Sequence, residues 1–211
     1  ARVAKFGVVV TAAGSLFEKS YIHAPEADED AATVVAGETV DVVAPGTNNA
    51  ANAFKFSITG QPEVDVKVDV VVTEADKDVF LKAGTYEKLT TGDAADEYVL
   101  GDNYYPVKYT LKHKGTAVAG AENVPLAELK TALAGISVAN VPANTNLGTT
   151  FGDYEISWRW DFGVNDDADT ILGDIAAGTP TAGLNGATLT ADVDYCLSTG
   201  LKVAVTVTQI D

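Results

Sequence analysis

The chain has 211 residues, 46% of them hydrophobic, and its 30 acidic and 14 basic side chains give a formal charge of −16. A surplus of negative charge repels phosphate backbones and anionic lipid, so we expect binding neither to nucleic acid nor to membrane surfaces. No apolar run approaches the roughly 18 residues that span a bilayer, so we expect no transmembrane helix.

The first segment of the chain predicts a β-strand. In ARVAKFGVVVTAAGSLF, apolar residues recur at every second position, at Ala4, Phe6, Val8, Val10 and Ala12. This alternation is typical of a strand with one apolar face. Chain termini are usually poorly ordered, so we expect so apolar a strand to be held in a sheet, either its own or another chain's. Because the sequence begins at Ala1 and not at Met, we also expect a mature chain from which a signal peptide has been cleaved.

Further strands are predicted by the same period of two. The alternation is found at residues 54–58, 64–72, 107–112, 154–162 and 201–207, and a shorter strand precedes Pro45 and Gly46. A last alternation places Leu189, Ala191, Val193, Tyr195 and Leu197 on one face and Cys196 on the other. Turn sequences lie at 59–63, 101–103 and 198–200, and we expect the last of them to join two antiparallel neighbours.

Two segments predict short helices. In NVPLAELKTALAG, Asn123 is the expected cap, Pro125 lies in the first turn and Gly135 ends a helix whose apolar stripe is Leu126, Leu129 and Leu133. In residues 165–178, NDDADTILGDIAAG, capping carboxylates begin a second helix. Seven or eight strands with so few helices predict one all-β domain, a jelly-roll-like β-sandwich with short helices inserted in its loops.

Few residues in the sequence suggest chemistry. The two histidines, His23 and His113, are isolated, the single Cys196 has no histidine near it in sequence, and no phosphate loop or nucleophile elbow occurs. Acidic residues at 26–30 and 165–169 are candidates for holding calcium. The second segment starts like a calcium loop but lacks its glycine and glutamate, so solvation or helix capping is the simpler interpretation. We therefore expect no catalytic residue, no metal site and no cofactor.

Several stretches together resemble one family. FSITGQPEVDVKV, YYPVKYTLKHKG, ISWRWDF, DDADTILG and VAVTVTQID, together with the opening ARVAKFGV, are similar to the TasA/camelysin family of secreted biofilm-matrix fibre proteins, which are exported through SipW-type signal peptidases. The resemblance covers nearly the whole chain in the family's order. It implies a jelly-roll subunit, an extracellular or cell-surface location, and fibres built by donor-strand exchange.

The resemblance also implies roles for particular residues. Residues 1–13 correspond to the donor strand and 14–211 to the jelly-roll domain, with the donor contacts at Val3, Ala4, Phe6, Gly7, Val8, Val10 and Ala12. Structural family motifs correspond to Trp158, Trp160, Asp169, Thr170 and Gly173. The implied partners are a second copy of the chain and other matrix components.

Two alternatives remain open from the sequence. The protein is a monomeric adhesin or carbohydrate-binding module if its N-terminal strand folds back into its own sheet, and Trp158 and Trp160 would then be candidates for contact with sugar. A secreted metallopeptidase is the second alternative, since some relatives carry that label, but the sequence offers no ligand set for it.

Overall fold

The computed structural model describes residues 5–13, 16–17, 43–72, 77–88, 96–178, 184 and 187–210. These residues form twelve strands and three α-helices, so the fold is all-β, as predicted. Residues outside these ranges include Val3, Ala4, His23, the acidic cluster at 26–30 and most of the short strand predicted before Pro45.

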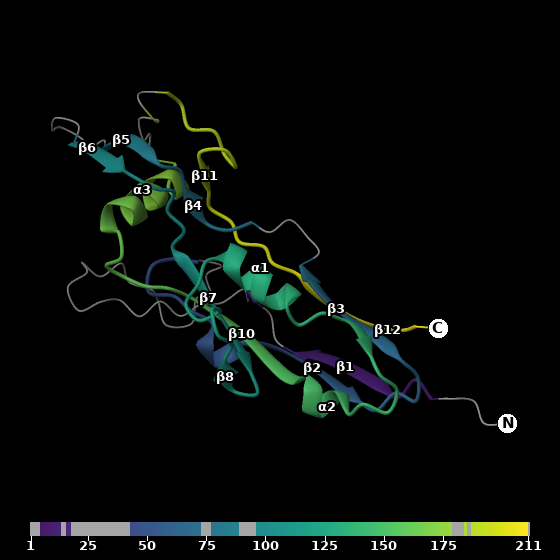
Figure 1. Cartoon of the computed structure of the whole chain (residues 1–211). Helices are drawn as coiled ribbons and strands as arrows, with labels where there is room; N and C mark the ends of the chain where they lie inside the picture. Colours follow the sequence, from purple (N-terminus) through teal and green to yellow (C-terminus); the bar gives the residue numbers. More distant parts are fainter. Residues whose placement is uncertain are drawn as a thin grey trace.

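Two larger sheets form the body of the protein (Figure 1). The first has five antiparallel strands in the order β1 (Val8–Ala13), β2 (Phe54–Gly60), β10 (Gly152–Trp160), β7 (Val107–His113) and β8 (Thr116–Ala117). The second has three strands in the order β12 (Val203–Gln209), β3 (Val66–Val72) and β9 (Val138–Val141).

Two small two-stranded sheets lie at the opposite end of the molecule from the start of β1 (Figure 1). One pairs β4 (Phe80–Leu81) with β11 (Tyr195–Cys196), and the other pairs β5 (Gly84–Lys88) with β6 (Asp96–Leu100). The helices are α1 (Leu126–Ala134), α2 (Leu147–Thr150) and α3 (Asp166–Ala176), and a short 3-10 turn, η1 (Ala50–Asn52), precedes β2.

The period-two alternation of the sequence is also the burial pattern of the strands. In β3, Val66, Val68 and Val70 are fully buried while Lys67 is exposed, and β7 and β10 alternate in the same way. Apolar side chains from both larger sheets meet in one core with α1, which packs on β3 and β7. Both larger sheets therefore bury one face, as half-apolar strands must. The jelly-roll connectivity stays a prediction.

The two predicted helices form, but their first residues differ from the prediction. Helix α1 is capped by Pro125 and not by Asn123, which instead adopts a φ of +55° and accepts a hydrogen bond from Arg159 Nε. A proline at the cap fits the site, since it needs no N–H there. Helix α3 is capped by the Asn165 amide, which accepts from the backbone N–H of Ala168, and the carboxylates occupy its first turn.

The prediction for residues 189–200 is wrong. Only Tyr195 and Cys196 form a strand there, Val193 is 60% exposed, and β11 and β12 belong to different sheets. The 198–200 turn therefore does not join antiparallel neighbours. A turn at Ala191–Asp194 interrupts the alternating segment before it can extend as a strand.

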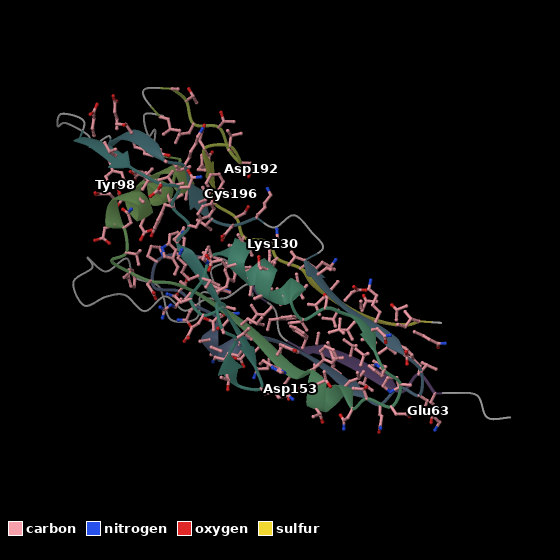
Figure 2. The ribbon with its side chains drawn as sticks, viewed as in Figure 1. Glu63, Tyr98, Lys130, Asp153, Asp192 and Cys196 are labelled. Atoms are coloured by element: carbon pink, nitrogen blue, oxygen red, sulfur yellow. The ribbon has the colours of Figure 1, made fainter. Side chains whose placement is uncertain are left out.

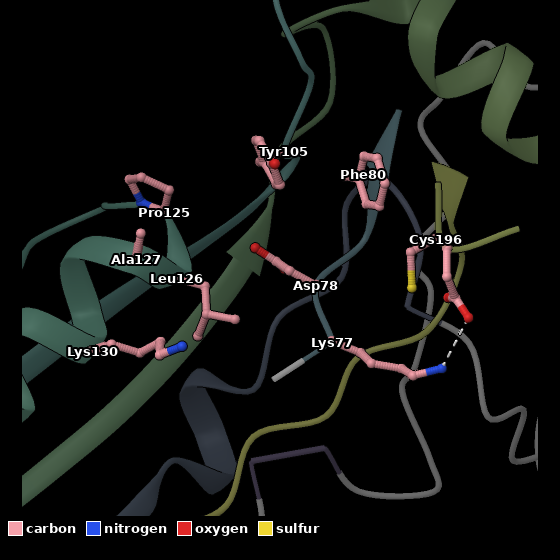
Figure 3. A pocket seen from close by; sticks show the side chains of 10 residues that line it. Lys77, Asp78, Phe80, Tyr105, Pro125, Leu126, Ala127, Lys130 and Cys196 are labelled. Carbon is pink, nitrogen blue, oxygen red and sulfur yellow. Dashed lines mark ion pairs between the residues drawn. The ribbon is translucent and has the colours of Figure 1, made fainter. Parts of the chain in front are cut away.

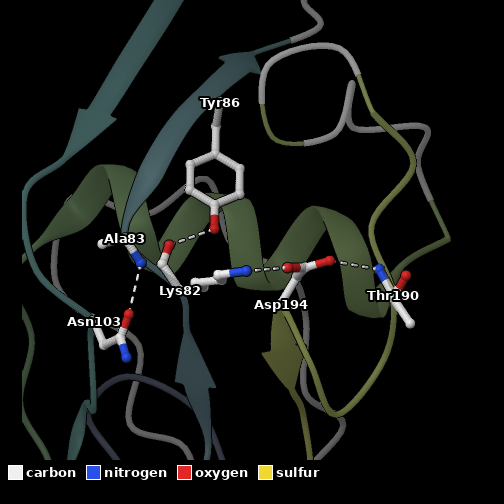
Figure 4. Close-up of polar contacts among 6 residues, drawn as sticks. All are labelled: Lys82, Ala83, Tyr86, Asn103, Thr190 and Asp194. Atoms are coloured by element: carbon white, nitrogen blue, oxygen red, sulfur yellow. Dashed lines mark hydrogen bonds and ion pairs between the residues drawn. The ribbon is translucent and has the colours of Figure 1, made fainter.

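Polar contacts hold this C-terminal segment against β4 and β5 (Figure 4). Lys82 Nζ donates to Asp194 Oδ1 at 3.0 Å, and the backbone N–H of Thr190 donates to Asp194 Oδ2 at 3.0 Å. These two donors hold the pKa of the Asp194 carboxyl below its ordinary value, with the Thr190 hydrogen bond the larger cause. The hydroxyl of Tyr86, which is fully buried, donates to the carbonyl of Lys82, so the same corner also satisfies a buried polar group.

None of the described helices has the length and apolar character needed to cross a membrane.

Candidate functional site

The N-terminal strand β1 lies at an edge of the five-stranded sheet. It pairs antiparallel with β2 of the same chain, and the register places Val8 opposite Gly60, Val10 opposite Ile58 and Ala12 opposite Phe56. The sheet order gives β1 one neighbour only, so its other edge has no ladder partner among the described strands. An edge of this kind can template the addition of another strand.

Close backbone contact extends the pairing beyond the first residue of β1. The carbonyl of Gly7 accepts from the backbone N–H of Gln61 at 3.1 Å. The carbonyl of Lys5 accepts from the backbone N–H of Glu63 at 2.9 Å, and the backbone N–H of Lys5 donates to the Glu63 carboxylate at 2.9 Å. Gly60 has a φ of +108°, and a Cβ there would lie 2.1 Å from the Gly7 carbonyl oxygen. Glycine is therefore required at residue 60 for β1 to approach β2 this closely.

The apolar face of β1 is only partly covered within the single chain. Val10 shares the inner face of the sheet with Ile58, yet Val10 is 40% exposed while Ile58 is fully buried. Phe6 is also 40% exposed and Ala12 is exposed, and among the described residues of this face only Val8 packs against the core. The strand thus keeps full main-chain pairing with β2 but incomplete side-chain burial.

The neighbouring edge of the second sheet is also open. Strand β12 is the terminal strand of the order β12-β3-β9, and it contacts β1. Val203, Val205 and Val207 of β12 are only partly buried, so both sheets are incompletely covered along this side. Figure 1 shows β1 and β12 extending to the same end of the molecule, and Figure 2 shows Glu63 at that end.

Residues 16 and 17, which follow β1, are anchored to the body of the protein. Leu16 is buried, and its carbonyl accepts hydrogen bonds from Trp158 Nε1 and from Asn49 Nδ2. The ring of Phe17 stacks on Trp158 with centroids 5.3 Å apart. The chain is therefore tied to β10 immediately after the strand, and β1 is the part that precedes this anchor. Asn49 also accepts from the backbone N–H of Trp158 at 2.6 Å.

The motif residues that the resemblance singles out lie in the body and not on the edge. Trp158 and Trp160 are 2% and 4% exposed, so neither ring is available to a sugar in this structure. Trp160 Nε1 donates to Asp169 Oδ1 at 3.1 Å, and Tyr104 donates to the same oxygen at 2.9 Å. Burial raises the pKa of the Asp169 carboxyl despite these two donors.

The other two motif residues make contacts within helix α3. The hydroxyl of Thr170 donates to the Asp166 carbonyl in the same helix. The carbonyl of Gly173 accepts from Ala177 near the end of that helix.

The remaining titratable candidates are separate from one another. His113 stacks on Tyr154 at 4.5 Å, and its Nε2 bonds the carbonyl of Phe151. Cys196 is buried, and its thiol contacts Ser198. Within the described ranges, no group of three or more histidine, cysteine, aspartate or glutamate side chains is arranged to hold a metal ion.

Three features of this site were missed by sequence reasoning. The open edge of β12 has no sequence signal, because an edge strand and an internal strand share the same alternation. The anchor at Leu16 and Phe17 has a weak signal, an apolar pair directly after Gly14 and Ser15. Asn49 is one polar residue in a loop, and its burial depends on Trp158 more than 100 positions later.

Comparison of the chain with protein-family models, with curated proteins and with solved structures finds no match.

Proposed function

We propose that this protein is the structural subunit of an extracellular filament, in which β1 of one subunit pairs with β2 of the next. The observation that carries the proposal is that β1 is an edge strand with full main-chain pairing and exposed apolar side chains. Polymers form in this way when an element common to all copies is exchanged between them.

The position of β1 in the chain supports such an exchange. Between Ala13 and Phe54 lie 40 residues, so no tight turn holds β1 on the β2 of its own chain. The anchor at Leu16 and Phe17 keeps the body intact when β1 leaves. An exchanged strand makes the same register with β2 of a second subunit, so little pairing energy is lost in the exchange.

Association would also bury side chains that the single chain leaves exposed. Covering Phe6 and Val10 at a subunit junction contributes at most about 1.5–3 kcal/mol for each large apolar side chain. The formal charge of −16 opposes this association until salt screens it. A location outside the cell and a homopolymer as the functional form belong to the same proposal.

A pair of cysteines tests the exchange directly. Thr11 and Ser57 lie opposite each other in the β1–β2 register, and their hydroxyl oxygens are 2.7 Å apart. We would replace both with cysteine in a chain that also carries Cys196→Ser, and compare it with the matched variant that carries Thr11→Cys and Cys196→Ser alone. After assembly and mild oxidation, a non-reducing denaturing gel reports which chain each strand is bonded to.

The two arrangements give different products. Strand exchange predicts a ladder of covalent oligomers from the double-cysteine chain, with fibres visible by negative-stain electron microscopy. If fibres form but the disulfide is entirely within single chains, the filament proposal stands and the exchange of β1 is wrong. If no fibres form at any salt concentration and all product is monomeric, the filament proposal is wrong.

One observation favours a second candidate function. Because β1 pairs with β2 of its own chain, a self-complemented secreted module that acts as a monomer, such as an adhesin, is the alternative. A variant that lacks residues 1–12 separates the two. A self-complemented monomer loses stability without that strand, whereas a filament subunit loses assembly and keeps a folded body, as measured by circular dichroism and electron microscopy.

A further inference from the structure

A cavity of about 620 Å³ lies between the start of α1, strand β4 and strand β11. Figure 3 shows Asp78 and Phe80 on one chain segment of its wall, Leu126 on the helix opposite and Tyr105 between them. The volume is sufficient for a small organic molecule. None of these residues belongs to β1, so a ligand bound in this cavity would be independent of filament formation.

One oxygen of the Asp78 carboxyl group is buried without a partner. Asp78 is 9% exposed, and its Oδ1 accepts a long hydrogen bond of 3.3 Å from the Tyr109 hydroxyl. Its Oδ2 has no hydrogen-bond partner in the part of the chain that the structure describes. The side chain extends toward the start of α1, in the cavity (Figure 3). Buried polar atoms are nearly always paired, so an unpaired carboxylate oxygen in a cavity indicates a missing donor.

The residues that line the cavity indicate which kind of ligand would carry the missing hydrogen-bond donor. Phe80 and Tyr105 have stacked rings with centroids 5.8 Å apart, and with Leu126 they give the cavity apolar walls. Lys77, at the rim, is already paired with Asp192 at 3.5 Å. The whole chain carries a charge of −16, which attracts cations. Aromatic faces also favour an organic cation over a neutral molecule.

We propose that this cavity binds a small organic cation, an apolar body that carries a primary ammonium group, with the ammonium donating to Asp78 Oδ2. The apolar body lies against Phe80, Tyr105 and Leu126. A primary ammonium has three donors, so it satisfies the unpaired oxygen and retains others for backbone groups or water.

Phenethylammonium is a suitable probe, and 2-phenylethanol is its neutral control of similar shape. We would measure binding by isothermal titration calorimetry at about pH 8 to the unmodified chain, to Asp78→Asn and to Asp69→Asn. Asp69 is the matched control, because it is a carboxylate on β3 that pairs with Lys67 outside the cavity. Each variant is first checked for its native circular dichroism spectrum.

The expected result is saturable binding of phenethylammonium that weakens about tenfold or more in Asp78→Asn and is unchanged in Asp69→Asn. The alcohol should bind at least about tenfold more weakly than the ammonium. Absence of saturable binding by the unmodified chain, equal binding by Asp78→Asn, or equal affinity for the alcohol would each overturn the proposal.

A pH series, measured first on the unmodified chain, gives a second test. Burial raises the pKa of Asp78 to about 6, so at about pH 5 most of the carboxyl is protonated and affinity for the cation should fall about tenfold relative to about pH 8. The charged and titratable groups around Asp78 are Lys77, Lys108, Tyr109, Lys130, Asp192 and Cys196. Because these groups also surround residue 78 in Asp78→Asn, a pH dependence that persists in that variant would contradict the assignment to Asp78.

Discussion

The buried carboxyl of Asp78 should make the protein less stable as the pH rises. Burial is the main cause that raises its pKa from 3.8 to about 6, and the hydrogen bond from Tyr109, the charge of Lys108 and the backbone N–H of Val79 oppose the rise. The native state therefore holds this proton more tightly than the unfolded state. Between about pH 4 and pH 6 the native state binds more protons, so stability from this group is lost as the pH rises through that window.

The size of the effect follows from the two pKa values. The pKa of Asp78 is about 6 in the folded protein and 3.8 in the unfolded chain, a difference of about 2. Each pKa unit corresponds to about 1.4 kcal/mol, so ionisation of Asp78 costs the folded protein about 3 kcal/mol. Asp78→Asn removes the ionisation but keeps an oxygen that can accept from Tyr109. The free energy of unfolding of the variant, minus that of the unmodified chain, should therefore rise by about 3 kcal/mol between about pH 4 and pH 8.

Urea unfolding at several pH values measures this difference. The fluorescence of the buried Trp158 and Trp160 follows unfolding, and a low protein concentration keeps both chains monomeric. The cost of placing an amide at residue 78 is the same at every pH, so it shifts the whole curve and leaves the slope unchanged. A difference that stays constant from about pH 4 to pH 8 would refute the reasoning that burial dominates the ionisation of Asp78.

Three other outcomes are expected. Gly60→Ala places a Cβ 2.1 Å from the Gly7 carbonyl oxygen, so it should detach β1, prevent fibre formation and expose the N-terminal segment to protease, and unchanged fibres would contradict this. Asn49→Ala removes the acceptor for the Trp158 N–H and should lower the free energy of unfolding by about 1–3 kcal/mol, as measured by urea denaturation. Fibre growth, followed by light scattering, should accelerate with added salt because screening weakens the repulsion between subunits of charge −16, and equal rates at low and high salt would refute the electrostatic argument.

The strands were predictable from the sequence where apolar and polar residues alternate and one face of the strand is buried. Val66, Val68 and Val70 repeat at the period of a strand, and one face of β3 is buried as the repeat requires. The same reasoning failed at residues 189–197, because the alternation is equally strong there but a turn interrupts the chain. Helix ends were predictable to within a few residues, and Asn123 was wrong because Pro125 also provides a cap.

The candidate sites were less predictable because they depend on distant contacts. The apolar pattern of β1 was visible in the sequence, but its exposure depends on which strands cover it, and no local signal gives that. Asp78 is one aspartate among many, and its burial arises where α1, β4 and β11 meet. Sequence periodicity reports which face of a strand is apolar, and not how completely that face is covered.

The placement of β1 and β12 at one end of the molecule decides where a label can be attached. A tag fused after Gln209 would occupy the space beside the β1 edge and would block any joint formed there. The turn at residues 101–103 follows β6 beside Ala83, where Leu100 pairs with Gly84, and a Cβ at Gly101 would meet no atom within 4 Å. A short epitope inserted at this turn should therefore mark each subunit for gold labelling while leaving both sheet edges accessible.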